Sequence, residues 1–164
     1  LASDATAVIA LCNPTSCAEF LKAMDSVVIG RPRPTVYQTS IVDMFAQFDK
    51  LGPKLVAGSP FTQVMPDPHR GISPLLKDYR KAMDKQQIKY NYRNFEGFLS
   101  AAVLVEGLRN AATLTPAGLI AAFESSFAKG VSFGAMTVRY QPKNHQGGTF
   151  VDLVTINRDG AIVH

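Results

Sequence analysis

Residues 5–29, ATAVIALCNPTSCAEFLKAMDSVVI, decide the fold class of this chain. Residues 5–11 are a short, continuous apolar run, which is typical of a strand buried on both faces of a parallel sheet. Asn13 is a good helix cap and Pro14 a good first-turn residue, so the residues that follow are predicted to form a helix. A strand, a tight cap and a helix in this order open a βαβ unit.

The alternation of strands and helices continues beyond this unit. Residues 35–42 predict a second strand and residues 43–52 a short helix. Residues 54–64 predict a third strand, which the Gly-Ser-Pro at 58–60 interrupts or marks as an edge. Short apolar strands that alternate with helices indicate an α/β domain with helices on the faces of its sheet.

A linker follows the third strand. Residues 65–72, MPDPHRGI, hold two prolines and a glycine, a composition that suits a crossover between layers or lobes. Ser73 and Pro74 then cap a predicted helix. One face of that helix carries four apolar residues: Leu75, Leu76, Tyr79 and Met83.

Residues 90–123, YNYRNFEGFLSAAVLVEGLRNAATLTPAGLIAAF, predict two further helices, the second beginning at Thr115-Pro116. Spacings of three and four residues predict that the first buries one face. That face consists of Phe98, Ala101, Ala102, Val105 and Leu108. Three aromatic residues stand just ahead of it: Tyr90, Tyr92 and Phe95. They could form an apolar wall for a small ligand or pack a lobe interface.

The last part of the chain is predicted to be β-structure. Residues 132–142 and 149–164 are strand-like, and Asp159-Gly160 is a tight-turn dipeptide within the second of these segments. The chain is therefore expected to end in antiparallel strands.

Composition is that of a globular protein. The chain has 164 residues, 46% hydrophobic and 18% charged, enough for one domain with a sizeable core, or one and a fraction. Lys and Arg are scattered and the net charge is +4, so we expect no nucleic-acid partner. No apolar stretch is long enough to span a membrane. The chain begins Leu-Ala-Ser-Asp, neither an initiator methionine nor a signal peptide, so we expect that it was trimmed from a longer one.

No catalytic or cofactor motif stands out in the sequence. The three histidines, His69, His145 and His164, fall in a linker, a turn and the terminus, where solvated loop positions are expected. Cys12 and Cys17 could form a disulfide at their spacing, but the spacing does not require one. No metal site and no cofactor are expected, and the sequence favours binding over catalysis.

Position in the α/β pattern supplies the candidate binding residues. In open parallel sheets, ligands bind beyond the carboxyl ends of the strands, which here are residues 12–16 and 38–40. Backbone N–H groups and hydroxyls at these ends could hold a carboxylate or another polar group. Alternatively, Asn13, Thr15 and Ser40 only cap helices.

With these features in place, the chain resembles the C-terminal half of a type I periplasmic solute-binding protein. The branched-chain amino-acid binding proteins of ABC transporters are the most similar group. The resemblance rests on residues 5–24, 94–125 and 132–163. The third stretch is the most specific because five of its residues match the family's closing pattern: Gly134, Pro142, His145, Gly147 and Gly148.

The resemblance implies two α/β lobes with doubly wound sheets and flanking helices, present here as a partial C-terminal fragment. Residues 1–64 would belong to lobe two, residues 65–129 would be the crossover and return helices of lobe one, and residues 130–164 would be closing strands of lobe two. A helix with a bare apolar face should not stay exposed. We therefore expect either that the first half was removed or that two copies pair as a homodimer.

By the same resemblance and by position, the ligand contacts fall at Asn13, Thr15, Thr39, Ser40 and Tyr92. No acidic residue stands at Thr39 or Ser40 to meet an α-ammonium group, so an aromatic acid, an amide or another small organic solute is as plausible as an amino acid.

The function implied is solute binding in the periplasm and delivery to a membrane ABC permease. The first alternative is a sensory ligand-binding domain of the same fold that reports to a receptor or regulator. The second is a small α/β hydrolase, for which Cys12, Cys17 or Ser16 with His145 is the available nucleophile and base.

Overall fold

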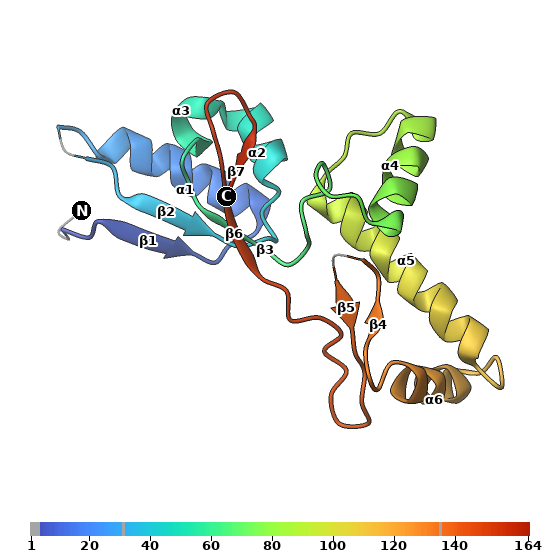
Figure 1. Ribbon diagram of the computed structural model, residues 1–164. Coiled ribbons are helices and arrows are strands. Elements are labelled where there is room, and N and C mark those ends of the chain that lie inside the picture. Colours follow the sequence, from blue (N-terminus) through green and yellow to red (C-terminus); the bar gives the residue numbers. More distant parts are fainter. Residues whose placement is uncertain (1–3, 31, 135) are drawn as a thin grey trace. The chain divides into compact units, whose positions relative to one another are not determined.

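The computed structural model describes residues 4–30, 32–134 and 136–164, and the chain forms two compact units (Figure 1). The first unit contains the residues up to Val64 together with Val151–His164, and the second contains Met65–Phe150. The division after Val64 falls at the start of the predicted linker. The chain returns to the first unit at Val151, later than the residue 130 expected from the sequence, because residues 130–150 pack against helices of the second unit.

The first unit is built on a mixed sheet whose order is β1-β2-β3-β6-β7. Its strands are β1 (Ala7–Ala10), β2 (Thr35–Gln38), β3 (Phe61–Gln63), β6 (Asp152–Ile156) and β7 (Ile162–Val163). The pairs β1–β2 and β2–β3 are parallel, and β6 is antiparallel to both β3 and β7. This parallel-rich sheet with flanking helices confirms the predicted α/β class.

The helices of the first unit are α1 (Pro14–Val27), α2 (Met44–Leu51) and α3 (Pro53–Val56). α3 corrects the third predicted strand, which was expected to begin at residue 54. Gly52 ends α2 with φ of 77°, and Pro53 starts a new helical turn in the first-turn position that proline favours. The strand itself therefore begins only at Phe61.

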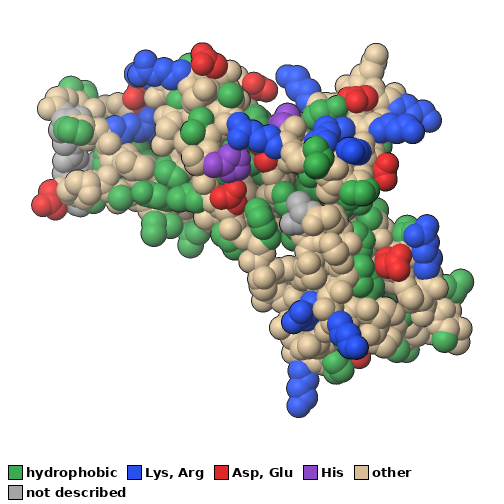
Figure 2. Space-filling model, in the orientation of Figure 1, with side chains coloured by type: hydrophobic (Ala, Val, Ile, Leu, Met, Phe, Trp, Pro, Cys, Tyr) green, Lys and Arg blue, Asp and Glu red, His purple; other side chains and the backbone are tan. Residues whose placement is uncertain are grey.

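One face of this sheet is buried and the other is open. Val36, Phe61 and Val154 are at most 2% exposed, whereas Ile9 on β1 is 76% exposed. Leu153 and Tyr37 are also exposed, and Figure 2 shows hydrophobic side chains gathered over β1. The prediction that the first strand is buried on both faces is therefore wrong. Among the described residues, β1 is an edge strand that pairs only with β2, and Ile9 lies on the exposed face of the sheet.

The second unit contains three helices and a two-stranded ribbon in its described part. They are α4 (Pro74–Gln86), α5 (Tyr92–Asn110), α6 (Pro116–Ser126), β4 (Val131–Ser132) and β5 (Thr137–Val138). Ser73 and Thr115 cap α4 and α6 as predicted, each accepting a hydrogen bond from a backbone N–H of the first turn. The main core cluster joins α5 and the residues that follow α6: Leu99, Val103, Phe127, Met136 and Val138.

The buried face of α5 differs from the predicted one. It consists of Tyr92, Phe95, Leu99, Val103 and Gly107. Val105 and Leu108, which were expected inside, are 44% and 41% exposed. Apolar residues occur around the whole circumference of this helix, so spacing alone allows more than one buried face. None of the helices in the described part of the chain is both long and apolar enough to cross a membrane.

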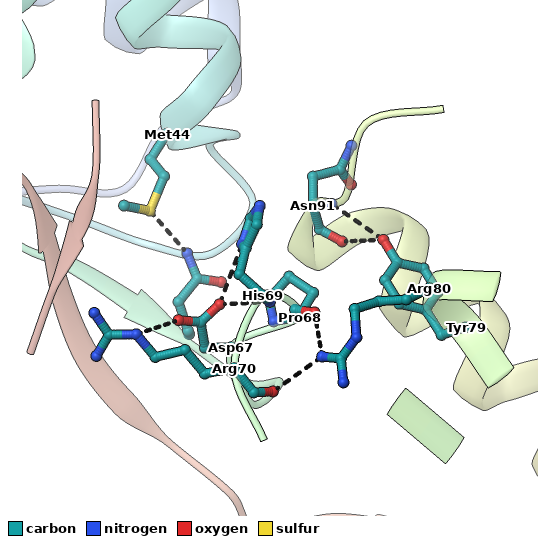
Figure 3. A network of polar contacts seen from close by, with 9 residues as sticks. Met44, Asp67, Pro68, His69, Arg70, Tyr79, Arg80 and Asn91 are labelled. Atoms are coloured by element: carbon teal, nitrogen blue, oxygen red, sulfur yellow. Dashed lines mark hydrogen bonds and ion pairs between the residues drawn. The ribbon is translucent and has the colours of Figure 1, made fainter. Parts of the chain in front are cut away.

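Figure 3 shows the polar network that organises the linker of the second unit. The side chain of Asp67 is only 6% exposed. Its carboxylate accepts a hydrogen bond from the backbone N–H of His69 at 2.8 Å and lies 3.2 Å from the His69 ring nitrogen Nδ1. Arg80 donates to the carbonyls of Pro68 at 3.2 Å and Gly71 at 2.8 Å. These contacts hold a proline-rich loop in one conformation.

The charge of Asp67 should make the protein sensitive to acid. Partial burial opposes ionisation, but hydrogen bonds from His69 and the nearby positive charges of His69 and Arg70 outweigh it, so the pKa of Asp67 is lowered. A lowered folded-state pKa stabilises the protein above the unfolded carboxyl value of about 3.9, and this stabilisation is lost as the pH falls through the folded value. We expect Asp67→Asn to cost about 1–3 kcal/mol at neutral pH.

Urea unfolding of Asp67→Asn and of the parent protein between about pH 7 and pH 3 checks this expectation. The difference between the two proteins should shrink as the pH falls. A difference that is constant over this range would show that the charge of Asp67 contributes nothing.

Candidate functional site

The carboxyl ends of β1 and β2 lie side by side in the first unit. Ala10, the last residue of β1, pairs with Gln38, the last residue of β2. The chain then turns from β1 into α1 and from β2 into α2, so both loops lie at the same edge of the sheet. This is the edge at which open parallel sheets bind ligands.

The first loop is shaped by its helix cap. The Asn13 side chain accepts a hydrogen bond from the backbone N–H of Ser16 at 3.0 Å, and Pro14 occupies the first turn. Thr15 and Ser16 are exposed beside it. The structure thus shows Asn13 as a cap, while the Thr15 hydroxyl stands at the surface of the helix start.

A disulfide closes this loop. Cys12 and Cys17 are bonded, with their Cα atoms 5.5 Å apart, and Cys17 is fully buried. The bond answers the question that the spacing left open, and it removes both thiols as candidate nucleophiles. Among the described residues, no group of His, Cys, Asp and Glu is arranged to hold a metal ion.

Loss of this disulfide should weaken the first unit. Closing so short a loop is worth about 2 kcal/mol in the chain-entropy treatment of the unfolded state. We expect the double variant Cys12→Ala/Cys17→Ala to lose about that much free energy of unfolding. Urea unfolding with and without reductant is the measurement: reductant should destabilise the parent protein and leave the variant unchanged. Equal stability of the two proteins without reductant would contradict the expectation.

The second loop leads from β2 into α2. Thr39 and Ser40 are partly buried, and the Thr39 carbonyl accepts a hydrogen bond from Val42 at 3.0 Å. Asp43 caps α2 by accepting from the backbone N–H groups of Phe45 and Ala46, each at 3.1 Å. The carboxylate nearest in sequence to the candidate hydroxyls is therefore already used as a helix cap.

Three buried glutamines near this edge were not predicted. Gln38, Gln47 and Gln63 are 2%, 3% and 3% exposed. Gln47 donates to the carbonyl of Pro14 at 3.3 Å and so ties α2 to the start of α1. No hydrogen bond from the described residues reaches the side-chain amide of Gln38. A polar residue at the inward position after Val36, in a strand of alternating burial, was the available signal.

Tyr92 belongs to the second unit, where it is 8% exposed as the first residue of α5. The aromatic residues around it pack on Tyr79 within that unit. The ring centroid of Tyr79 lies 5.1 Å from that of Phe95 and 5.9 Å from that of Tyr90. Packing within the second unit therefore explains the position of Phe95, and it contributes to that of Tyr90.

Each histidine has an acidic partner. His69 contacts Asp67, His145 lies 2.8 Å from Glu124, and His164 lies 3.0 Å from Asp152. The hydrolase alternative needs His145 beside a nucleophile. His145 instead faces Glu124, and the two cysteines are closed in the disulfide, so Ser16 is the only nucleophile left to that alternative.

Solved structures share this fold. An extracellular ligand-binding receptor from Verminephrobacter eiseniae EF01-2 is 23% identical over 99% of the chain with a TM-score of 0.85, and the match covers 46% of that protein. A possible leucine/isoleucine/valine-binding protein from Rhodopirellula baltica SH 1 is 22% identical over 97% of the chain, with a TM-score of 0.84 and 42% coverage of that protein.

A branched-chain amino acid ABC transporter structure from Thermus thermophilus, with bound valine, is 15% identical over 95% of the chain with a TM-score of 0.73, and 44% of it is covered. The chain thus spans less than half the length of these structures. Comparison with curated protein sequences gives no significant match.

The loops of this α/β unit converge at the carboxyl edge of its parallel strands, the place at which sheets of this kind bind ligands. The sequence pattern of the periplasmic binding protein family matches residues 1–161. The chain belongs to that family.

Proposed function

We propose that this chain is part of an extracytoplasmic protein that binds a small organic solute and delivers it to a membrane ABC permease. The observation that carries the proposal is the family match over residues 1–161. The bound valine of the Thermus thermophilus structure supports an amino acid or a related carboxylate or amide as the solute class. Binding without turnover requires neither a cofactor nor a metal, and this proposal includes no catalytic step.

The two loops of the sheet edge supply the polar part of the proposed site. The hydroxyls of Thr15, Thr39 and Ser40 can donate to or accept from a solute. The start of α1 offers backbone N–H groups and the positive end of a helix dipole to a carboxylate. Asn13 fixes that helix start, and its carbonyl oxygen is engaged in the cap.

The rest of the site comes from the second unit in this proposal. Tyr92 supplies an apolar wall, the first unit is lobe two, and the second unit belongs to lobe one. Solute would be enclosed as the lobes close around it, and its affinity would come from apolar burial with a few directional hydrogen bonds.

The disulfide supports a periplasmic location. Disulfides persist in oxidising compartments such as the bacterial periplasm and are rare in the cytosol. The Cys12–Cys17 bond is present at the edge of the proposed site, where Cys17 is fully buried.

A sensory role is the alternative that one observation favours. One similar structure is that of an extracellular ligand-binding receptor. Uptake of labelled solute into membrane vesicles separates the two roles. A transport protein should stimulate uptake when added with its permease, whereas a sensor should bind solute without changing uptake.

Two open apolar faces lead us to propose that the isolated chain pairs with a second copy. Ile9 and Leu153 are exposed on the sheet of the first unit, and Val105 and Leu108 on α5 of the second. Apolar patches of this kind mark interaction surfaces in soluble proteins. A homodimer of the 164-residue chain would cover at least one of them.

Sedimentation velocity of the isolated chain tests this pairing. We expect a concentration-dependent dimer that Ile9→Lys/Leu153→Lys weakens at least tenfold, on the order of 1.4 kcal/mol. Ile72→Lys is the matched control, because Ile72 is 82% exposed but lies in the linker. A well-behaved monomer at all concentrations would contradict the pairing.

The solute-binding proposal is tested by thermal unfolding of the full-length protein with single solutes. A bound solute stabilises the folded state, whereas no effect from any amino acid, aromatic acid or amide would count against the proposal.

A further inference from the structure

A pocket lies in the second unit. It has a volume of about 140 Å³ and is lined by Ile120, Phe123, Tyr140 and His145. Ile120 and Phe123 come from α6, and Tyr140 and His145 come from the segment that follows β5 (Figure 1). The proposed solute site uses none of these residues.

The walls of this pocket are fixed by neighbouring glycines. A Cβ atom on Gly107 would lie 2.3 Å from the Phe123 ring, and a Cβ atom on Gly147 would lie 2.8 Å from the Tyr140 hydroxyl oxygen. Both rings therefore rest directly on backbone. The Phe123 and Tyr140 rings meet edge to face with centroids 5.3 Å apart. The shape of the pocket is thus preformed.

His145 and the Tyr140 hydroxyl are the polar groups among the lining side chains, and a carboxylate orients His145. Its Nε2 lies 2.8 Å from an oxygen of Glu124, whose side chain is 24% exposed. A carboxylate partner favours the tautomer that carries the proton on the contacting nitrogen. In the neutral ring, Nδ1 is then a hydrogen-bond acceptor. The Tyr140 ring meets the imidazole edge to face at 6.5 Å.

We propose that this pocket binds a small planar aromatic molecule that carries one N–H donor. Apolar and aromatic walls with a small number of oriented polar groups are typical of small-molecule sites. A cavity of about 150 Å³ in another protein accommodates a benzene ring, so the volume suits one small ring system. The walls select a flat apolar body, and His145 accepts a hydrogen bond from the N–H.

Indole and 1-methylindole are the probes: methylation removes the N–H donor and adds one methyl group, and the His145→Phe variant separates these two effects. Titration of the protein at about pH 8, followed by NMR shifts of the Ile120 methyl groups, reports binding at this site. We expect indole to bind with a Kd on the order of 1 mM, and 1-methylindole several-fold more weakly. No shift of the Ile120 methyl groups with indole would overturn the proposal.

Three variants locate the binding. His145→Phe should keep a ring in the pocket and abolish the preference for indole over 1-methylindole. Ile120→Ala should weaken both probes, measured through shifts of the surrounding backbone amides. Leu114→Ala is the control, because Leu114 is 80% exposed and does not line the pocket. Equal binding of the two probes by the parent protein would refute the role of His145, and unchanged binding by Ile120→Ala would refute the site.

Discussion

Gly107→Ala should destabilise the protein by about 1–3 kcal/mol, whereas Gly97→Ala on the same helix should stabilise it by about 0.5–1 kcal/mol. Alanine is a better helix former than glycine at both positions. At Gly107, however, the new Cβ would lie 2.3–2.9 Å from three atoms of the Phe123 ring. At Gly97 nothing lies within 4 Å of it.

The clash at Gly107 is costly because the Phe123 ring can move away from the new Cβ only by breaking its contacts with two other aromatic rings. Its centroid lies 5.4 Å from that of Phe127 and 5.3 Å from that of Tyr140. Phe127 is fully buried in the main cluster of the second unit. Overpacking of such a core lowers the free energy of unfolding by more than the better helix propensity of alanine raises it. The change in stability therefore has opposite signs at the two glycines.

Urea unfolding of the two single variants measures both effects under one set of conditions. The glycine pair acts as its own control, because the substitution and the helix are the same. Stabilisation by both variants would contradict the packing of α5 on α6 through Gly107.

Ser40→Ala and Thr39→Val should each lower solute affinity about tenfold, since one hydrogen bond to a polar solute is worth roughly 1–2 kcal/mol. Both hydroxyls stand at the carboxyl end of β2, in the loop before α2. Ser26→Ala is the matched control. Ser26 lies near the other end of α1, where its hydroxyl donates to the carbonyl of Ala23. Solute affinity is measured by isothermal titration of the full-length protein. Unchanged affinity in both loop variants would remove this loop from the site.

Asn13 needs a different substitution, because alanine would also remove a helix cap worth about 1 kcal/mol. Asn13→Asp keeps an oxygen that can accept from Ser16 and adds a negative charge. With a carboxylate solute, this variant distinguishes the role of Asn13 as a helix cap from its role in binding. Stability should be preserved, while affinity for an acidic solute should fall.

Local sequence signals predicted the helix starts and the final turn correctly. The caps at Asn13, Ser73 and Thr115 are present, each with its side chain accepting a backbone hydrogen bond. The turn before β7 contains Gly160 with φ of 83°, as the Asp-Gly pair indicated. Such features depend on a few neighbouring residues, so one sequence is enough to identify them.

Burial was harder to predict because it depends on what covers a surface. The residues of α5 are apolar on several sides, and the pattern favoured Val105 and Leu108 over Leu99 and Val103, which are the buried ones. The apolar run at residues 7–10 likewise forms an edge strand with Ile9 exposed. Periodicity identifies the element but does not choose between two apolar faces.

The candidate site was likewise predicted only in part from the sequence. The strand-end rule found the two loops of the sheet edge, because it follows from the topology of parallel strands. It included residue 38 in a strand end without identifying its side chain as buried, although the alternation with Val36 is a local sign that Gln38 faces inward, and it did not find Gln47. Tyr92 was predicted from the family resemblance and its position in the chain, and its aromatic neighbour Phe95 packs on Tyr79.

The most direct test of the central claim is thermal unfolding of the full-length protein with single amino acids, aromatic acids and amides. We expect at least one solute to stabilise the protein, by about 2.7 kcal/mol at a concentration of 100 times its Kd, and Ser40→Ala to reduce this effect at a fixed concentration. If no solute of these classes changes the unfolding temperature, the proposed solute binding is contradicted.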